Sequence, residues 1–499
     1  MRMPARALAL IIGFTALAQG GHDYWAATGI YLAVLVLSLA VLLRSTWPAG
    51  AEGYSMPLAL PLAVLAAALA LSCAGAVNPG ESFVAWLDWL AALAVLLTAA
   101  NVLRSEAELD DFLMWLSPLF FIELIVNLAQ RDPRHPFASQ PPGTLINSNA
   151  ATAFLIGWVP VFVDRFRRQT EARMRRFWAA VLAANVAGCL LFISSWGMLC
   201  LLAALPFLSG PRGLAAWIRR RPRLIAAVAA TAAVGAALLL RYKLTHALDF
   251  DGATVPAGRN TARIMWWASG LRMFWEHPWL GVGLGNYPSA YISYKVGTGQ
   301  HTLSAHSFPV KMLAETGLIG AGAWLALLAA WRQRLVAGWT ESFPRWPFIL
   351  GILLFLGYSI ISMGMEYLSH LLALGLFLGI SIGRMPAPRW KPRRVILVAV
   401  TATGLATIPY LIAPFLASRL WVGAQGLLAA GDAAGAERGF AAAAESFPLS
   451  FEAQRGWAQA RFARGDAAGA IAHQSRAIRL NSRMELLRRE LEVYRGSAQ

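Results

Sequence analysis

Long apolar stretches are the feature of this sequence that most constrains its fold. A helix needs about 20 apolar residues to cross a bilayer, and about thirteen stretches of roughly that size occur along the chain. They lie at residues 7–20, 24–43, 57–76, 83–103, 112–129, 146–163, 177–193, 195–209, 223–241, 309–331, 347–363, 366–383 and 395–416. The first is short and follows two arginines, as in a cleaved signal peptide, but no polar domain comes after it, so we count it as a span. The sequence therefore predicts an all-α, polytopic membrane protein with about 13 transmembrane helices.

The basic residues give this topology an orientation, because Lys and Arg collect in cytoplasmic loops. The chain has 43 Lys+Arg against 26 Asp+Glu, a formal net charge of +17, which on a soluble protein would suggest nucleic acid as a partner. When the N-terminus is placed in the cytoplasm and the spans alternate, 23 of the 43 basic residues fall in cytoplasmic segments. The charge is therefore interpreted as a record of topology, with no nucleic-acid partner, and the odd number of spans places the C-terminus on the external side.

Composition disfavours a soluble enzyme and several kinds of catalytic site. Hydrophobic residues make up 58% of the chain and charged residues 14%, which is more apolar than soluble proteins of this size. Cys73, Cys189 and Cys200 lie in apolar runs without metal-ligand spacing, so neither a disulfide framework nor a metal site is expected. The sequence contains no P-loop and no nucleophile elbow, and the glycine-rich residues 281–285 follow no strand, which excludes a dinucleotide-binding turn.

One long external loop, at residues 242–308, separates the ninth and tenth spans. Loops longer than about 15 residues are usually functional or disordered, and this one is too aromatic for a solvated linker. Its aromatic residues are Trp266, Trp267, Phe274, Trp275, Trp279, Tyr287, Tyr291 and Tyr294. Residues 260–276 have amphipathic helical spacing, with Ile264, Trp267, Leu271 and Phe274 on one face, and Pro278 is expected to end this helix. The loop therefore predicts a folded structure at the membrane surface.

The C-terminal segment carries an internal repeat. The sequence Gly-Asp-Ala-Ala-Gly-Ala occurs at 431–436 and again at 465–470, and this offset of 34 residues is the period of tetratricopeptide helix pairs. We therefore predict a tetratricopeptide-like domain, a type of module that commonly binds a protein partner. The expected division of the chain is 1–241 and 309–416 for transmembrane helices, 242–308 for a catalytic loop and 417–499 for the repeat domain.

The residues that can carry chemistry all lie on the external side. They are two arginines one helical turn apart, a histidine just before the tenth span with two charged residues after it, and two asparagines at the mouth of the sixth span. These residues are Arg259, Arg263, His306, Lys311, Glu315, Asn147 and Asn149. Each has a structural alternative, since arginines also bind lipid headgroups and asparagines also cap helices. Together they suggest glycosyl transfer from a lipid pyrophosphate, because histidine can accept a proton from a hydroxyl and arginine forks bind a pyrophosphate without a metal.

Several motifs in this region resemble the signature of the bacterial O-antigen ligase and polymerase superfamily. They are Arg263-x-x-Trp266, the run His-Pro-Trp-Leu-Gly-Val-Gly-Leu-Gly-Asn-Tyr at 277–287, His306, and Leu-Ala-Glu-Thr-Gly-Leu-Ile-Gly at 313–320. Gly143-Thr144 and Asn147-x-Asn149 are similar to the other recurrent motif of that family. The resemblance covers roughly residues 60–385, and its core at 263–320 is specific in order and spacing.

This resemblance implies a multi-pass glycosyltransferase of the GT-C type in the bacterial inner membrane. It implies an undecaprenyl-diphosphate-linked glycan as donor, transfer or polymerisation in the periplasm without a metal or other cofactor, and lipid A core, a protein or another glycan as acceptor. His306 matches the family's essential histidine, and Arg263 matches an arginine that contacts the donor diphosphate. Two positions depart from the family pattern, because Ser307 replaces an asparagine and Trp196 follows Ser195 where a Ser-Arg pair is usual. The missing charge would then come from Arg259, Arg241 or Lys243, unless the donor is handled differently.

Two other classes of function stay open on sequence grounds. A transporter or flippase-like protein could use the same arginines to escort an anionic lipid, although few ionisable residues lie inside the spans. A membrane scaffold could act mainly through residues 417–499. Deletion of that segment would abolish the function of a scaffold but leave some transfer activity in an enzyme.

Overall fold

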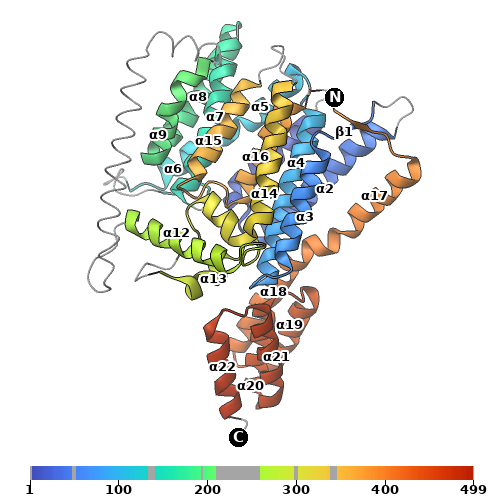
Figure 1. Ribbon diagram of the computed structural model, residues 1–499, viewed down its shortest axis with the longest axis vertical. Helices are drawn as coiled ribbons and strands as arrows, with labels where there is room; N and C mark the ends of the chain where they lie inside the picture. The colour runs from blue at the N-terminus through green and yellow to red at the C-terminus, as the bar shows by residue number, and fades with distance from the viewer. Residues whose placement is uncertain are drawn as a thin grey trace.

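The computed structural model describes residues 3–47, 52–132, 141–145, 147–192, 195–209, 259–296, 302–337, 345–383, 385 and 387–497. Helices dominate this part of the chain, and the only strand pairing in it is one short antiparallel ladder that joins Tyr54–Ser55 (β1) to Arg389–Trp390 (β2). Figure 1 shows a bundle of roughly parallel helices from which a smaller group of helices extends at the C-terminal end. The predicted all-α, polytopic membrane fold is confirmed.

The helices of the bundle follow the predicted apolar stretches. Six helical segments in the described residues are long and apolar enough to cross a membrane, and several others are apolar but shorter. Their bounds are Met3–Leu17 (α1), Gln19–Gly21 (η1), Tyr24–Thr46 (α2), Ala59–Cys73 (α3), Pro79–Val102 (α4), Glu106–Leu116 (α5), Pro118–Ala129 (α6), Ser148–Arg168 (α7), Ala172–Leu191 (α8), Ser195–Ala204 (α9), Leu205–Ser209 (η2), Phe308–Ala337 (α14), Trp346–Ser359 (α15), Leu368–Ile382 (α16), Arg394–Ala406 (α17) and Ile408–Ala429 (α18). The predicted ninth span, at 223–241, lies outside the described residues.

Three predicted spans contain breaks that the hydrophobic pattern does not reveal. The fifth divides into α5 and α6 at Pro118, because proline starts a helix readily but lacks the amide that continues one. The thirteenth divides into α17 and α18 at Thr407, and α18 then runs through the expected domain boundary at 416. Within α14, Gly317 has φ +60° and ψ −160°, so its two halves are separated by a kink.

The C-terminal helices form a structural repeat. They are Ala433–Ser446 (α19), Phe451–Ala463 (α20), Ala467–Leu480 (α21) and Glu485–Gly496 (α22). In both copies of the sequence repeat, an aspartate caps the following helix by accepting a bond from a glycine amide: Asp432 from Gly435 and Asp466 from Gly469, each at 2.8 Å. The repeated sequence therefore builds the same helix start twice. Assignment to the tetratricopeptide class stays a prediction.

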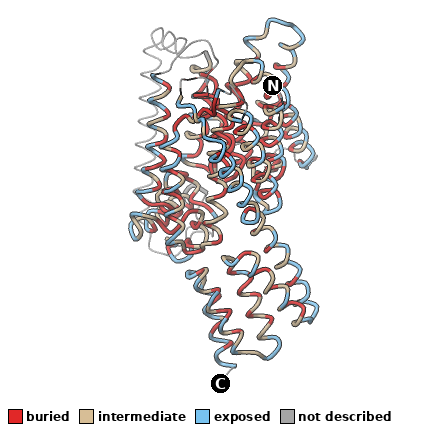
Figure 2. Tube along the Cα trace, turned by 90° about the vertical axis from the view of Figure 1, so that its right-hand side faces the viewer, coloured by how far each residue is buried: buried red, intermediate tan, exposed pale blue. Residues whose placement is uncertain are grey.

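Buried side chains concentrate inside the bundle, and exposed ones cover its outside (Figure 2). The main core is rich in leucine, phenylalanine and alanine, with Trp158, Phe162 and Phe377 packed ring against ring. Glycines let the helices approach closely: a Cβ on Gly375 or Gly379 of α16 would lie 2.3 Å from a backbone carbonyl oxygen of α4. This close packing fixes the helix ends on which the candidate site is built.

Candidate active site

The loop that was predicted between the ninth and tenth spans has its own small core at one end of the bundle. Two helices of this loop, Arg259–Glu276 (α12) and Tyr287–Tyr294 (α13), lie at the lower end of the bundle in Figure 1. Their buried residues include Trp266, Met273, Tyr287 and Tyr291, which pack with Ala314 of α14. The predicted helix at 260–276 is therefore present, and as predicted, a proline follows its end.

The buried face of α12 is not the apolar face expected from the sequence. Ile264, Trp267 and Phe274 are only partly buried and Leu271 is exposed, whereas the inward face consists of Ala262, Met265, Trp266, Ser269, Gly270 and Met273. A Cβ on Gly270 would lie 2.7 Å from the Val310 side chain, so small residues are needed where α12 contacts α14. The bulky apolar face is left on the outer side, where it suits the membrane surface.

The broken helix α14 and the segment after α12 satisfy each other's backbone groups. Leu318 and Ile319 donate their amides to the carbonyls of Pro278 and Trp279 at 2.8 and 3.2 Å, and the amide of Val282 donates to the carbonyl of Ala314 at 2.9 Å. The kink at Gly317 is what brings these groups together, and a Cβ there would lie 2.4 Å from the carbonyl carbon of Trp279. The two family-like runs at 277–287 and 313–320 are thus the two sides of one contact.

Glu315 and Asn286 complete this contact. The Glu315 carboxylate accepts the amides of Gly285 and Tyr287, each at 3.0 Å. The Asn286 side chain bonds to the backbone amide and carbonyl of Asn78, at the start of α4, at 2.5 and 3.0 Å. Glu315 was predicted to bind substrate, which stays a prediction, and the structure shows its carboxylate holding the loop. Asn286 belongs to the family-like run at 277–287, but the sequence did not predict its contact with Asn78.

His306 sits in a constrained conformation just before α14. Its φ is +50°, a region that non-glycine residues rarely adopt. Its amide donates to Ser304 Oγ at 2.8 Å, and Ser304 Oγ donates to the carboxylate of Glu366. Strained residues of this kind persist where the surroundings hold them, which is common at active sites.

The ring of His306 stacks on Trp266, with ring centroids 4.6 Å apart and planes 21° from parallel. Trp266 is itself fixed, because Tyr287 Oη donates to its carbonyl at 2.6 Å. Among the described residues, the buried Nδ1 of His306 has no hydrogen-bond partner. The imidazole is therefore held by its face, while one ring nitrogen is left for another partner.

Arg263 lies one turn before Trp266 on α12 and acts on the same imidazole. Burial lowers the pKa of His306 from its usual value of 6.5 to about 4, and the positive charge of Arg263 contributes to that shift. The structure thus brings together the two residues predicted to be catalytic. His306 is neutral at physiological pH, so it can accept a proton. Arg259 begins α12, but its side chain lies outside the described part, as do Arg241 and Lys243.

A group of charged residues lies beside the loop, around a cavity of about 50 Å³. Lys311 Nζ is 3.9 Å from Glu315, and the cavity is also lined by Asp88 of α4 and Glu366. Asp88 accepts a hydrogen bond from Tyr31 Oη at 2.5 Å. The sequence argument against a transporter was that few ionisable residues lie inside the spans. The structure places more ionisable side chains inside the bundle than that argument assumed. Lys311, predicted to bind substrate, faces these carboxylates.

Asn147 and Asn149 hold the start of α7 against the segment before α16. Asn147 caps α7 by accepting the amide of Ala150 at 2.8 Å, and its Nδ2 donates to Tyr367 Oη at 2.7 Å. Asn149 Oδ1 accepts Tyr358 Oη at 3.4 Å. The structural alternative for Asn147 is thus observed, and substrate binding by the pair stays a prediction.

A cation that the sequence did not indicate lies near the turn between α8 and α9. Arg131, at the end of α6, is 7% exposed, and its Nε donates to Asn127 at 3.1 Å. Its guanidinium also donates to the carbonyl of Leu191, the last residue of α8. At the start of α9, Trp196 Nε1 donates to the carbonyl of Tyr358 at 3.2 Å. Arg131 therefore lies beside the end of α8, and Ser195-Trp196 follows a few residues later in the chain.

The fold and site are those of a polytopic membrane protein in which a histidine and an arginine lie together at one end of the helix bundle. A family model described as O-antigen ligase matches residues 179–325. This match spans α12, α13, His306 and the first half of α14, and it confirms the resemblance to the O-antigen ligase superfamily. The membrane part therefore has the character of a glycan-transferring enzyme. No curated protein matches the chain significantly.

Proposed function

We propose that the protein transfers a glycan from an undecaprenyl-diphosphate donor to an acceptor hydroxyl on the periplasmic face of the inner membrane. The observation that carries this proposal is the pairing of His306, with Nδ1 unsatisfied among the described groups, with Arg263 one helical turn from the tryptophan on which the imidazole stacks. The family match supports glycan transfer in general, and the basic residues of the opposite loops support the orientation.

Glycan transfer by this route needs a proton acceptor and a positive charge beside the leaving diphosphate, and the site contains both. Neutral His306 accepts the proton of the acceptor hydroxyl as the hydroxyl oxygen attacks the anomeric carbon. The bond from that carbon to the phosphate oxygen breaks, and the electron pair leaves with the lipid diphosphate, whose charge Arg263 stabilises. Attack from the side opposite the leaving group inverts the anomeric centre, and no step requires a metal ion.

Arg131 supplies the second positive charge for the diphosphate in this proposal. Its position beside the α8–α9 turn supports this role, since a second cation is expected there and the chain reads Ser195-Trp196. Arg131→Gln should raise the KM for the donor roughly 10- to 100-fold, because a hydrogen bond to a charged group contributes roughly 1.5–3 kcal/mol. Arg131→Lys keeps the charge and should recover part of the affinity; equal KM values in all three proteins would remove Arg131 from donor binding.

The direct test is transfer by purified protein in lipid nanodiscs, with a polyprenyl-diphosphate glycan and an acceptor hydroxyl compound. His306→Ala should abolish transfer while leaving expression and membrane insertion unchanged. His22→Ala, which removes an exposed histidine before α2, is the matched control and should transfer normally. Transfer at the wild-type rate by His306→Ala would exclude the histidine from the mechanism.

The same assay separates the alternatives. Transfer that persists with a chelator present would support a metal-independent enzyme over a transporter that only escorts the lipid. A chain truncated after Ala430 should retain some transfer activity, whereas a scaffold that acts through 417–499 would lose its whole function. The repeat domain is assigned to recognition of a protein partner or acceptor.

A further inference from the structure

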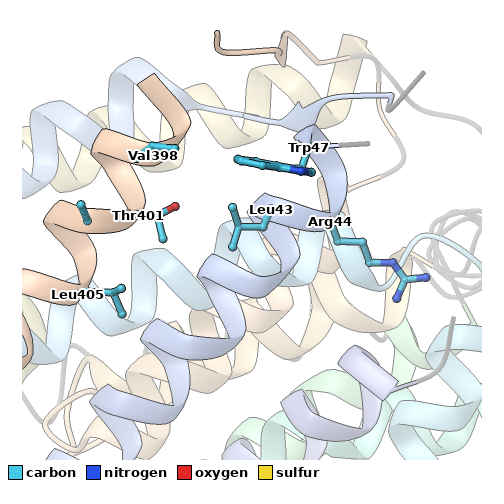
Figure 3. A pocket seen from close by; sticks show the side chains of 7 residues that line it. Leu43, Arg44, Trp47, Val398, Thr401 and Leu405 are labelled. Atoms are coloured by element: carbon cyan, nitrogen blue, oxygen red, sulfur yellow. The ribbon is translucent and has the colours of Figure 1, made fainter. Parts of the chain in front are cut away.

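A second apolar site lies at the end of the bundle opposite His306. A groove of about 640 Å³ runs between α2 and α17 and is lined by Leu43, Arg44, Trp47, Val398, Thr401, Ala402 and Leu405. Figure 3 shows Leu43 and Trp47 on one side facing Val398, Thr401 and Leu405 on the other. Almost all of its surface is apolar carbon, so its occupant must be apolar where it contacts the two helices.

The shape of the groove favours a single hydrocarbon chain. The two helices approach near Gly404, where a Cβ would lie 3.3 Å from the Leu39 side chain, and the groove lies between this contact and Trp47. The lining on α17 extends from 398 to 405, only about 10 Å along the helix. This is too short to seat another transmembrane helix, whereas a lipid tail can enter it from the membrane.

Basic residues gather at the end of the groove near Trp47. Arg394, in the first turn of α17, has its guanidinium carbon 5.6 Å from the centroid of the Trp47 ring, a cation–π contact. Lys391 and Arg393 lie just before it and are exposed, and Arg44 points its guanidinium outward from α2 (Figure 3). Among the residues that the structure describes, none in the groove lining is acidic. An apolar groove that opens at a basic cluster is complementary to a lipid with an anionic headgroup.

The position of the groove end near Trp47 excludes the glycan donor as the molecule that binds in the groove. α2 has 23 residues and is about 35 Å long, so the groove mouth at Trp47 and the candidate active site lie at opposite faces of the bilayer. In Figure 1 the start of α17 lies at the side of the bundle, well above α12 and α13, which lie at its lower end. A diphosphate bound near Trp47 could not reach His306.

We propose that this groove binds an anionic phospholipid, with an acyl chain between α2 and α17 and the phosphate beside Arg394. In the orientation proposed above, this lipid belongs to the cytoplasmic leaflet. The lipid would join α17 to the bundle, since α17 otherwise exposes Val395 and Val398 by 79% and 54%. This binding is independent of glycan transfer, and its test does not require the transfer assay.

The experiment compares retained lipid on the full-length protein by native mass spectrometry after delipidation. Dioleoyl phosphatidylglycerol should bind more tightly than dioleoyl phosphatidylcholine, which has the same chains and no net charge. Arg394→Gln should weaken phosphatidylglycerol binding about fivefold, given about 1 kcal/mol for each basic residue near the headgroup. Arg489→Gln, on the exposed side of α22, removes the same charge far away and should have no effect.

A second pair of variants tests the groove itself. Ala402→Trp fills it from an exposed position, so it should fold normally and prevent lipid retention. Ile396→Trp places the same ring on the opposite face of α17 and should retain the lipid. Equal binding of both lipids, or undiminished binding by Ala402→Trp, would overturn the proposal. A dimer in place of a lipid adduct would also overturn it, because the occupant would then be a second copy of this chain.

Discussion

At the scale of single residues, His306 combines backbone strain, burial and a neighbouring positive charge. Burial and Arg263 both lower its pKa, to about 4, so the neutral form persists well below pH 6.5. The acidic limb of the pH profile is the decrease in kcat/KM as the pH is lowered. If the neutral imidazole accepts the proton, this limb should lie near pH 4 for the free enzyme. Arg263→Gln removes the repulsion and should move that limb upward toward 6.5, in addition to weakening donor binding.

Arg263→Lys is the control for this shift, because it keeps the positive charge and should keep the limb low. The measurement is the pH profile of kcat/KM for the three proteins. A limb at the same pH in Arg263→Gln and the wild type would show that the charge of Arg263 does not act on the titrating group.

Glu366 is the residue that holds the histidine segment in place. It accepts the hydroxyl of Ser304, which in turn accepts the amide of His306. Glu366→Ala should lower kcat by roughly 10- to 100-fold, the equivalent of about 1.5–3 kcal/mol for a lost bond to a charged group, while the KM for the donor changes little. Glu366→Gln keeps an acceptor and should recover most of the rate. A parallel measurement of His306 modification by diethyl pyrocarbonate should show faster reaction in Glu366→Ala, whereas an unchanged rate would argue against a positioning role.

At the scale of elements, the contact between α14 and residues 278–283 depends on Gly317. Its φ and ψ are accessible essentially to glycine alone, at a cost of about 1–3 kcal/mol for another residue. Gly317→Ala should therefore lower the thermal unfolding temperature in detergent and abolish transfer. Gly322, on the same helix with open space around it, is the matched control: Gly322→Ala should be stabilising by roughly 0.5–1 kcal/mol. Similar losses of stability in both variants would contradict the special role of the kink.

These elements also show what the sequence could and could not predict. The positions of the spans could be predicted because a helix that crosses a bilayer needs about 20 apolar residues, and such runs are visible in the sequence. The break at Gly317 leaves no such mark, because glycine inside an apolar run is common in membrane helices. The inward face of α12 was also missed, since small residues such as Ser269 and Gly270 pack closely without being hydrophobic. The sequence motifs place His306 and Arg263 in one loop. Only the folded structure shows which carboxylates hold that loop in place.

At the scale of the whole molecule, the repeat domain and the loop that contains α12 and α13 meet at one end of the bundle. Arg483 Nη2 donates to Tyr294 Oη at 3.2 Å, and the Phe447 and Phe83 rings lie 5.8 Å apart. The repeat domain is therefore packed directly against α13 and the start of α4. An acceptor or partner held by the repeat domain would be delivered to the same face as His306.

This arrangement makes the orientation of the chain testable with two cysteines. Ser497 ends the repeat domain, and Glu171 lies in the turn between α7 and α8; both are exposed. In a background with Cys73, Cys189 and Cys200 replaced by alanine, Ser497→Cys should react with a membrane-impermeant maleimide in intact spheroplasts. Glu171→Cys should react only after lysis, because the basic residues around it mark the cytoplasmic side. Labelling of Glu171→Cys in intact spheroplasts would reverse the orientation and place His306 in the cytoplasm, where a periplasmic acceptor could not reach it.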